Sequence, residues 1–504
     1  MLNPSFLFTD GAVLQRERPV PVFGECDARS VSVSYLDRTA SATVRDGRFE
    51  AILPPMPAGL SGELIITTDA GEQITFSDVL TGDVYLAGGQ SNMEHPLFCT
   101  YHGADSLERD DGIRLFTVPR RPYEGADVIG WHFYMLRSED TPWRVYDKDS
   151  VWGFSAVAAF FAKRLRASVD VPIGIINCNW GATNAETWVS REALLEKPLA
   201  RFAVDKYDEA YSDIDKEKYH ADFEKFCSEM RHYINTHPTP MDDSERYGID
   251  YSLRHHFPKT IPEGPYHYKT PGAYRKTMLE RVIPYALAGV LWYQGESNVR
   301  ADLPYDTREW FREVMHTLID EWREDFRDSE LPFYIVQISS YETDYRPEGE
   351  KWCPIRDVHE KLAEEYTNVY TVPSVDIGEP GNIHPANKKP IGERLALAAL
   401  ANRYGMDVPW RCPKISSVRH SGNEYILSFT DGEGLFSRGG APEGFYATAG
   451  EAVYPISARI ENDLVIIRSD IPLDKISYAY RNFSRANVYN GHSLPLFPFK
   501  YELK

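Results

Sequence analysis

The first part of the chain alternates hydrophobic and polar residues in short runs. The runs begin near Val13 and continue to about Phe76, with Gly, Pro and Asp between them. A period of two places successive side chains on opposite faces, which is typical of half-buried β-strands. The sequence therefore predicts a small N-terminal β-sandwich over residues 1–78, as a separate module.

From Asp83 the pattern changes to continuous hydrophobic runs separated by stretches of helical periodicity. Continuous runs suit strands that are buried on both faces. The runs are residues 83–87, 171–177, 287–293, 333–338 and 369–373. Helical spacing of apolar residues occurs in 154–165, 310–322 and 391–403. Strands that alternate with helices predict a mostly parallel sheet covered on both sides, an α/β domain over residues 79–404.

Two regions depart from this rhythm. Residues 190–275 are charged and rich in Tyr, with a helical pattern over 206–233 followed by a loop that contains His255, His256 and His267. We expect an insertion over the sheet here, and loops on a rigid scaffold often determine specificity. After Tyr404 the period of two returns, which predicts a C-terminal β-domain over residues 405–504.

Composition narrows the possible partners. The chain has 504 residues and a net charge of −20, and no basic run stands out, so nucleic acid and membrane partners are not expected. Its six cysteines are scattered without the spacing of a zinc site or a disulfide framework. The N-terminus shows neither a signal-peptide pattern nor a membrane span, which favours a cytoplasmic location.

Candidate chemistry lies where the buried runs end, because ligands of open α/β sheets bind at the carboxyl ends of the strands. The first run ends in Gly88-Gly89-Gln90-Ser91. Glycines permit a tight turn whose backbone N–H groups can face a developing oxyanion, although a Ser in such a turn is also a common helix cap. A serine nucleophile needs a base. His384, after the last strand of the α/β part, is the preferred base, and His95 is a lesser alternative.

Three motifs carry a resemblance to a known family: Gly89–Glu94 (GQSNME), Trp292–Asn298 (WYQGESN) and Ile383–Lys388 (IHPANK). Together they resemble the sialate O-acetylesterase family, a branch of the SGNH hydrolases. The resemblance implies an SGNH-type, flavodoxin-like three-layer sandwich flanked by β-domains. It also implies a serine esterase that removes acetyl groups from sugar hydroxyls and needs no cofactor or metal.

The resemblance also assigns roles to matching positions. Ser91 becomes the nucleophile and His384 its base, and the oxyanion donors become the Ser91 N–H, the Gly181 N–H and the Gln294 side chain. We expect Asn92 and Glu296 to brace the turns by hydrogen bonds rather than touch substrate. Three tryptophans at strand ends are candidates to stack on a sugar, although such aromatics more often belong to the core: Trp180, Trp188 and Trp292.

The chain departs from the family pattern at two positions. Gly381 stands where SGNH hydrolases often carry an Asp, three residues before the catalytic His. The nearby acids are Asp376 and Glu379; alternatively a backbone carbonyl orients the imidazole and leaves a Ser-His dyad. Ala182 stands where relatives commonly carry a second glycine, which should shape the pocket more than the chemistry.

Several functions remain open at this stage. Acetylated sialic acid, acetylated xylan and other acetyl-sugars fit the same apparatus, and a sialic acid site should offer Arg or Lys to the carboxylate, with Arg275 and Arg300 as candidates. The alternatives are a non-catalytic carbohydrate-binding protein, a lipase or thioesterase on the same fold, and a glycosidase, which would need two carboxylates across one bond.

Overall fold

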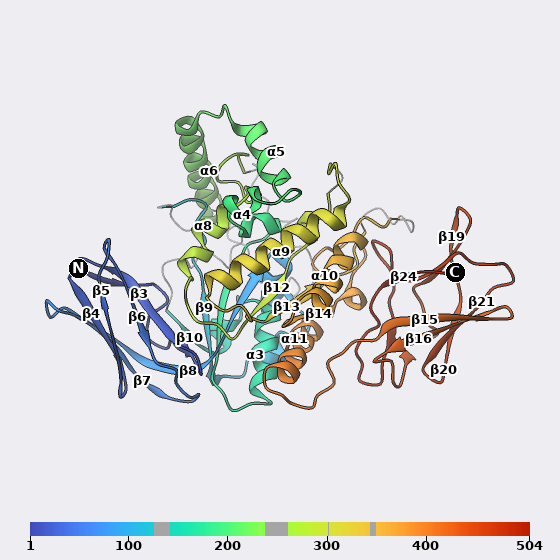
Figure 1. Cartoon of the computed structure of the whole chain (residues 1–504), viewed down its shortest axis with the longest axis horizontal. Helices are drawn as coiled ribbons and strands as arrows, with labels where there is room; N and C mark the ends of the chain where they lie inside the picture. Colours follow the sequence, from blue (N-terminus) through green and yellow to red (C-terminus); the bar gives the residue numbers. More distant parts are fainter. Residues whose placement is uncertain (125–141, 237–260, 301, 343–348, 504) are drawn as a thin grey trace.

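The chain forms three regions that follow one another across the molecule (Figure 1). In the computed structural model, the described residues are 1–124, 142–236, 261–300, 302–342 and 349–503. The N-terminal β-strands lie at one end, an α/β region lies in the centre, and the C-terminal β-strands lie at the other end. The predicted α/β fold with additional β-domains is thus confirmed at this level of description.

The central sheet is mostly parallel. Its strands, in spatial order, are β10 (Arg144–Tyr146), β9 (Asp110–Thr117), β11 (Ile173–Asn179), β8 (Gln73–Gly89), β12 (Gly289–Tyr293), β13 (Phe333–Gln337) and β14 (Val369–Pro373). Only β10 is antiparallel to its neighbour in this series. All residues of β11, β12 and β13 are buried, as their continuous hydrophobic runs predict. Because β8 lies between β11 and β12, the strand order reverses at β8, and such a switch point is the usual ligand site.

Four helices pack around this sheet. They are α3 (Ala156–Arg166), α9 (Thr307–Asp325), α10 (Cys353–Glu365) and α11 (Lys389–Asn402). Helix α3 packs on α11, and α9 packs on α10. The helices predicted at 154–165, 310–322 and 391–403 correspond to α3, α9 and α11 with slightly shifted ends. Shorter helical segments connect the elements: α1 (Ser91–Glu94), η1 (Leu97–Cys99), η2 (Ala104–Ser106), α2 (Lys148–Val151), η4 (Ala185–Trp188), η5 (Leu279–Arg281), η6 (Glu296–Asn298) and η7 (Val375–Ile377).

The N-terminal strands are divided between two sheets. They are β1 (Leu2–Pro4), β2 (Val13–Gln15), β3 (Val20–Cys26), β4 (Ser30–Tyr35), β5 (Arg38–Thr43), β6 (Arg48–Leu53) and β7 (Ser61–Thr68). Strands β2, β4, β5 and β7 belong to the same 11-stranded sheet as the central strands, whereas β1, β3 and β6 form a three-stranded sheet of their own. The 17-residue strand β8 pairs with β7 along its first part and with β11 and β12 along its second. One hydrophobic core therefore runs from Leu64 and Val79 to Val84 and beyond.

The described part of the predicted insertion, residues 190–236 and 261–275, is largely helical and protrudes from the central region (Figure 1). Its helices are α4 (Arg191–Leu195), α5 (Phe202–Tyr211), α6 (Lys216–Thr236) and α8 (Ala273–Thr277). The single helix expected over 206–233 is instead two helices, α5 and α6, because the helix is interrupted between Tyr211 and Lys216. Helix α6 contributes Phe223 and Met230 to a small core of its own. His255 and His256 lie outside the described residues.

The C-terminal region is made of β-strands. They are β15 (Lys414–Ser421), β16 (Glu424–Thr430), β17 (Phe436–Ser437), β18 (Phe445–Ala449), β19 (Ala452–Pro455), β20 (Ala458–Glu461), β21 (Leu464–Arg468), β22 (Lys475–Tyr478), β23 (Val488–Tyr489) and β24 (Phe499–Glu502). They form two four-stranded sheets and one two-stranded sheet around a second core that includes Leu427 and Ile476.

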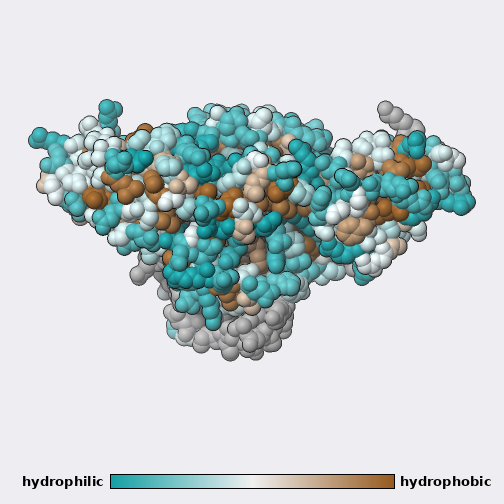
Figure 2. All heavy atoms as spheres, turned by 90° about the horizontal axis from the view of Figure 1, so that it is seen from below, coloured by the Kyte–Doolittle hydropathy of each residue, from teal (hydrophilic) through white to brown (hydrophobic). Residues whose placement is uncertain are grey.

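Hydrophobic and hydrophilic residues are interspersed on the face of the molecule in Figure 2. Within the described part of the chain, no helix has both the length and the hydrophobicity to span a bilayer.

Candidate active site

Ser91 lies at the switch point of the central sheet, directly after β8. The strand ends at Gly89, whose φ of +132° belongs to the region that favours glycine. A Cβ on Gly89 would lie 2.1 Å from the Tyr293 carbonyl oxygen, so the turn also needs glycine for space. The Gln90 N–H donates to the same carbonyl at 3.0 Å. This close approach of β8 and β12 fixes where Ser91 begins α1.

The structure brings Ser91 and His384 together. Ser91 Oγ and His384 Nε2 are 2.8 Å apart, although 293 positions separate them in the sequence. His384 lies on the loop between η7 and α11, and its N–H donates to Asn382 Oδ1 at 3.0 Å. Glu379 accepts from the Asn382 amide and from the Ala386 N–H, both at 2.8 Å. A partly exposed hydroxyl and imidazole at this distance form the pairing that an activated serine requires.

The carboxylates of both predicted acids, Asp376 and Glu379, accept hydrogen bonds from groups other than the imidazole of His384. The Asp376 carboxylate accepts from both terminal nitrogens of Arg394, at 2.8 and 2.6 Å, and from the Tyr489 hydroxyl at 3.1 Å. Glu379 holds the loop as described above rather than the ring. The sequence left the partner of the imidazole open between these two acids and a backbone carbonyl. In the structure, Asp376 is a buried partner of Arg394, and Glu379 supports the backbone around His384.

The Gly181 N–H, an expected oxyanion donor, already has a partner. It lies beside Ser91, since a Cβ on Gly181 would be 3.5 Å from the Ser91 Cβ. However, it donates to Glu94 Oε2 at 2.6 Å. Glu94 Oε1 accepts from Arg120 at 3.2 Å, and both side chains are at least 96% buried. The structure thus differs from the expected oxyanion role of Gly181, because its N–H already donates a hydrogen bond to a carboxylate.

Gln294 also differs from its expected role. Its side chain is fully buried, and Nε2 lies 3.2 Å from Gln90 Oε1, 3.2 Å from the Thr183 carbonyl and within hydrogen-bond distance of Asn298 Oδ1. An amide nitrogen has two hydrogens, so these acceptors leave none for a substrate oxygen. Gln294 joins the loops after β8, β11 and β12. In the part of the chain that the structure describes, the Ser91 N–H has no acceptor and remains available to an oxyanion.

Asn92 and Glu296 form the expected brace. Asn92 Nδ2 donates to Glu296 Oε1 at 2.5 Å and to the Ile383 carbonyl at 3.1 Å. Asn92 Oδ1 accepts from Lys388 Nζ, and Lys388 is fully buried. Burial lowers the pKa of Lys388 to about 7 and raises the pKa of Glu296. Lys388 closes the third motif, but its role was not predicted because a Lys at a helix start usually faces solvent.

The other expected substrate contacts belong to the core or to ion pairs. Trp180 is 1% exposed and stacks on Tyr274, with ring centroids 4.2 Å apart. Trp188 and Trp292 are fully buried. Arg275 pairs with Asp325, and Arg300 pairs with Asp302.

Three remaining positions have local roles. His95 Nε2 lies 3.1 Å from the Cys99 carbonyl oxygen. Burial lowers the pKa of His267 to about 4. Ala182 is exposed and has a φ of +61°, the left-handed region that a glycine adopts without strain. In the described residues, no group of three or more His, Cys, Asp or Glu could hold a metal ion.

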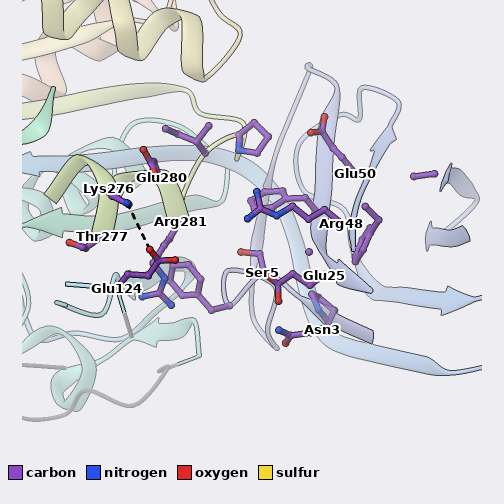
Figure 3. A pocket seen from close by; sticks show the side chains of 18 of the residues that line it. Asn3, Ser5, Glu25, Arg48, Glu50, Glu124, Lys276, Thr277, Glu280 and Arg281 are labelled. Carbon is purple, nitrogen blue, oxygen red and sulfur yellow. Dashed lines mark ion pairs between the residues drawn. The ribbon is translucent and has the colours of Figure 1, made fainter. Parts of the chain in front are cut away.

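A cavity of about 1230 Å³ lies away from these residues, between the N-terminal strands and the α8–η5 segment. Figure 3 shows Arg48 and Glu25 on one side of it and Glu280 and Arg281 on the other. A dashed line marks the ion pair of Lys276 with Glu124, at 3.9 Å. Its walls contain none of the predicted site residues.

Comparison with known proteins shows that part of the central region is similar to a known family. Residues 267–401, which contain the second and third motifs, match the sequence model of the family described as carbohydrate esterase, sialic acid-specific acetylesterase. This part of the chain is therefore similar to the esterase domains that this family model describes. The predicted resemblance is thereby confirmed, and the family is one of carboxylic-ester hydrolases, as predicted.

Curated relatives extend the similarity over most of the chain. The sialate O-acetylesterase of Mus musculus is 25% identical over 407 residues, which are 74% of this chain and 66% of the relative. The sialate O-acetylesterase of Homo sapiens is 24% identical over 402 residues, 74% of this chain and 64% of the relative. The chain thus spans about two thirds of the length of these relatives.

A solved structure is similar over the whole chain. A carbohydrate acetylesterase from Xanthomonas citri has 28% sequence identity and a TM-score of 0.75, covering 99% of this chain and 100% of the other. The two structures are therefore similar across the N-terminal, central and C-terminal regions.

Proposed function

We propose that the protein is a carbohydrate O-acetylesterase with Ser91 as nucleophile and His384 as base. The observation that carries the proposal is the 2.8 Å contact between Ser91 Oγ and His384 Nε2 at the switch point of the sheet. The esterase family of residues 267–401 and the relatives named as sialate O-acetylesterases support the substrate class. The finer fold assignment, an SGNH-type flavodoxin-like three-layer sandwich, is part of this proposal.

The mechanism proceeds through an acetyl-enzyme. Ser91 Oγ attacks the acetyl carbonyl carbon while His384 Nε2 accepts its proton, and the Ser91 N–H stabilises the oxyanion. The intermediate collapses, the bond to the sugar oxygen breaks, and His384 protonates that oxygen. Water then loses a proton to His384 and attacks the acetyl carbon, which releases acetate and restores Ser91.

The substrate is an acetyl ester on a sugar hydroxyl, carried by sialic acid or by a plant glycan. In the structure, both arginines suggested for a sialic acid carboxylate are engaged by acidic side chains, Arg275 by Asp325 and Arg300 by Asp302. The observations on these two residues therefore favour neither sugar, and the assay has to include both.

The test measures acetate released from O-acetylated sialic acid and from acetylated xylan oligosaccharides. Wild type should release acetate from at least one of them, and Ser91→Ala should reduce turnover by at least about 1,000-fold, because the hydroxyl forms the covalent bond. Ser421→Ala, an exposed serine on β15, serves as a matched control and should keep wild-type turnover.

The two other outcomes are equally informative. Acetate release that survives in Ser91→Ala would overturn the assignment of the nucleophile. If wild type releases no acetate but binds either glycan, the protein is the non-catalytic carbohydrate-binding alternative.

A further inference from the structure

A buried charged network adjoins the Ser91–His384 pair through Asn92, the residue after Ser91. It consists of Lys388 at the start of α11, Asn92 on α1 and Glu296 on η6. Lys388 and Asn92 are fully buried, and Glu296 is 8% exposed. Lys388 Nζ also lies 5.6 Å from the centre of the Tyr293 ring, a distance at which a cation is attracted to the ring face. Charges are buried in this way only where they have specific partners.

The two charged groups can fix the orientation of the Asn92 amide. A charged Lys only donates hydrogen bonds, so it must face the amide oxygen, and an ionised Glu only accepts, so it must face the amide nitrogen. The observed contacts obey both constraints: Oδ1 accepts from Lys388, and Nδ2 donates to Glu296. Rotating the amide by 180° would place like groups against each other on both sides.

The amide orientation matters because of its third contact. The second hydrogen of Nδ2 is donated to the carbonyl of Ile383, the residue before His384. Asn92 itself follows Ser91 in the chain. One amide therefore connects the turn of the nucleophile to the loop of the base.

We propose that Lys388 and Glu296 are positioning residues that hold the Asn92 amide in one orientation and thereby keep His384 against Ser91. The inference rests on the proposed esterase function, because it concerns the same pair. Neither residue touches the reacting atoms, so both act through Asn92.

The proposal predicts a dependence on pH. Lys388 faces the carboxylates of Glu296 and Glu379 and the ring of Tyr293. The two carboxylates raise the pKa of Lys388, but burial lowers it by more, so that the pKa is about 7. Below that pH the ammonium group only donates. Above it the neutral amine can also accept, so the orientation of Asn92 is less strictly enforced. The contribution of Lys388 should therefore decrease as the pH rises above about 7.

The first experiment compares kcat and KM of Lys388→Met with wild type on the acetylated sugar that wild type hydrolyses. Methionine keeps the length of the side chain and removes the charge and the donor. We expect kcat to fall by roughly 10- to 100-fold with KM little changed, because small displacements of reacting groups have effects of this size. The decrease should be larger at pH 6 than at pH 9. Lys389→Met, the next residue of α11, is the matched control and should leave kcat unchanged.

A double-mutant cycle tests whether Lys388 acts through Asn92. In the background of Asn92→Ala, adding Lys388→Met should lower kcat by less than two-fold. A merely structural role of Lys388 would lower kcat in both backgrounds. If Lys388→Met does not fold, Glu296→Gln replaces it, because glutamine keeps the shape but can present either a donor or an acceptor to Asn92.

The outcomes separate this inference from the proposed function. If Ser91→Ala abolishes activity while Lys388→Met and Glu296→Gln keep wild-type kcat at every pH, the positioning role is overturned and the esterase assignment stands. If Ser91→Ala remains active, the esterase assignment itself fails. Full additivity in the cycle also overturns the positioning role.

Discussion

Glu94 and Arg120 show how single residues near the site depend on each other. Their side chains are 3% and 4% exposed, and the Glu94 carboxylate also accepts the Gly181 N–H. Arg120 donates in addition to the carbonyl and side-chain oxygens of Asn179 at 3.0 and 3.1 Å. The ion pair therefore ties the end of β11 to the helix that begins with Ser91.

Glu94→Ala should be strongly destabilising. The change leaves the Arg120 charge buried without its carboxylate and the Gly181 N–H without its acceptor, so the free energy of unfolding should fall by about 3 kcal/mol or more. Urea unfolding followed by tryptophan fluorescence measures this. Glu451→Ala, at an exposed turn, is the control and should change the value by less than about 0.5 kcal/mol. Equal stability of the two variants would contradict the role given to the ion pair.

The residues of the site were only partly predictable. Ser91 and His384 were found because each lies in a short motif after a buried run. The partners of Asp376 could not be predicted from the sequence. Arg394 lies 18 positions and Tyr489 lies 113 positions further along the chain, and no local sequence pattern connects either residue with Asp376. Likewise nothing near Arg120 in the sequence indicates that it pairs with Glu94.

Among the elements, helices α3 and α11 pack closely against each other. Gly392 on α11 faces α3, and a Cβ there would lie 2.6 Å from the Phe160 Cβ and 2.6 Å from the Val157 carbonyl oxygen. The glycine allows the two helix backbones to approach. Because α11 begins a few residues after His384, this packing also fixes the loop of the base.

Gly392→Ala should destabilise the protein, although helix propensity alone predicts the opposite. Alanine favours a helix by about 1 kcal/mol over glycine. The added methyl group, however, overlaps backbone and side chain of α3, and overpacking of a core costs about 1–3 kcal/mol. We expect a lower midpoint of thermal unfolding than for wild type. Glu393→Ala, the next residue on α11, is the control and should not lower the midpoint. A raised midpoint for Gly392→Ala would mean that α3 and α11 separate easily.

On the scale of the whole molecule, Arg356 joins the central and C-terminal regions. It is 1% exposed and donates to the Ile338 and Ser339 carbonyls at 3.1 and 2.9 Å, which follow β13. It also donates to the carbonyls of Arg481 and Asn482 at 2.7 and 3.0 Å. One buried guanidinium therefore satisfies backbone acceptors of both regions.

Arg356→Met should weaken the attachment of the C-terminal region. The Ile338, Ser339 and Arg481 carbonyls lose the donor that Arg356 provides. The Asn482 carbonyl keeps the Tyr341 N–H, and each group left unsatisfied costs about 1–3 kcal/mol. We expect faster limited proteolysis between residues 404 and 504 and a lower urea midpoint. Arg312→Met removes a surface ion pair with Glu365 and should change neither measurement appreciably. Unchanged proteolysis of Arg356→Met would show that other contacts hold the two regions together.

The sequence by itself determined the alternation of elements and the identity of the Ser91 and His384 pair. Hydrophobic periodicity is a local property, so it predicted the buried strands and the helices α3, α9 and α11. Short motifs are local as well, and they named the family. These are the features that depend on residues close together in the chain.

Only the tertiary structure decided which polar groups are partners. The carboxylate of Glu94 on the Gly181 N–H depends on a contact across 87 positions, and the contact of the buried Gln294 with Gln90 spans 204 positions. Likewise, only the folded chain shows that β8 pairs with β7 along its first part and with β11 and β12 along its second. A hydrogen-bonding group leaves no periodic signature, and its partner is whichever group the packed chain brings within about 3 Å. Because β8 lies between β11 and β12, the polar residues that follow these two strands are the ones that lie beside Ser91.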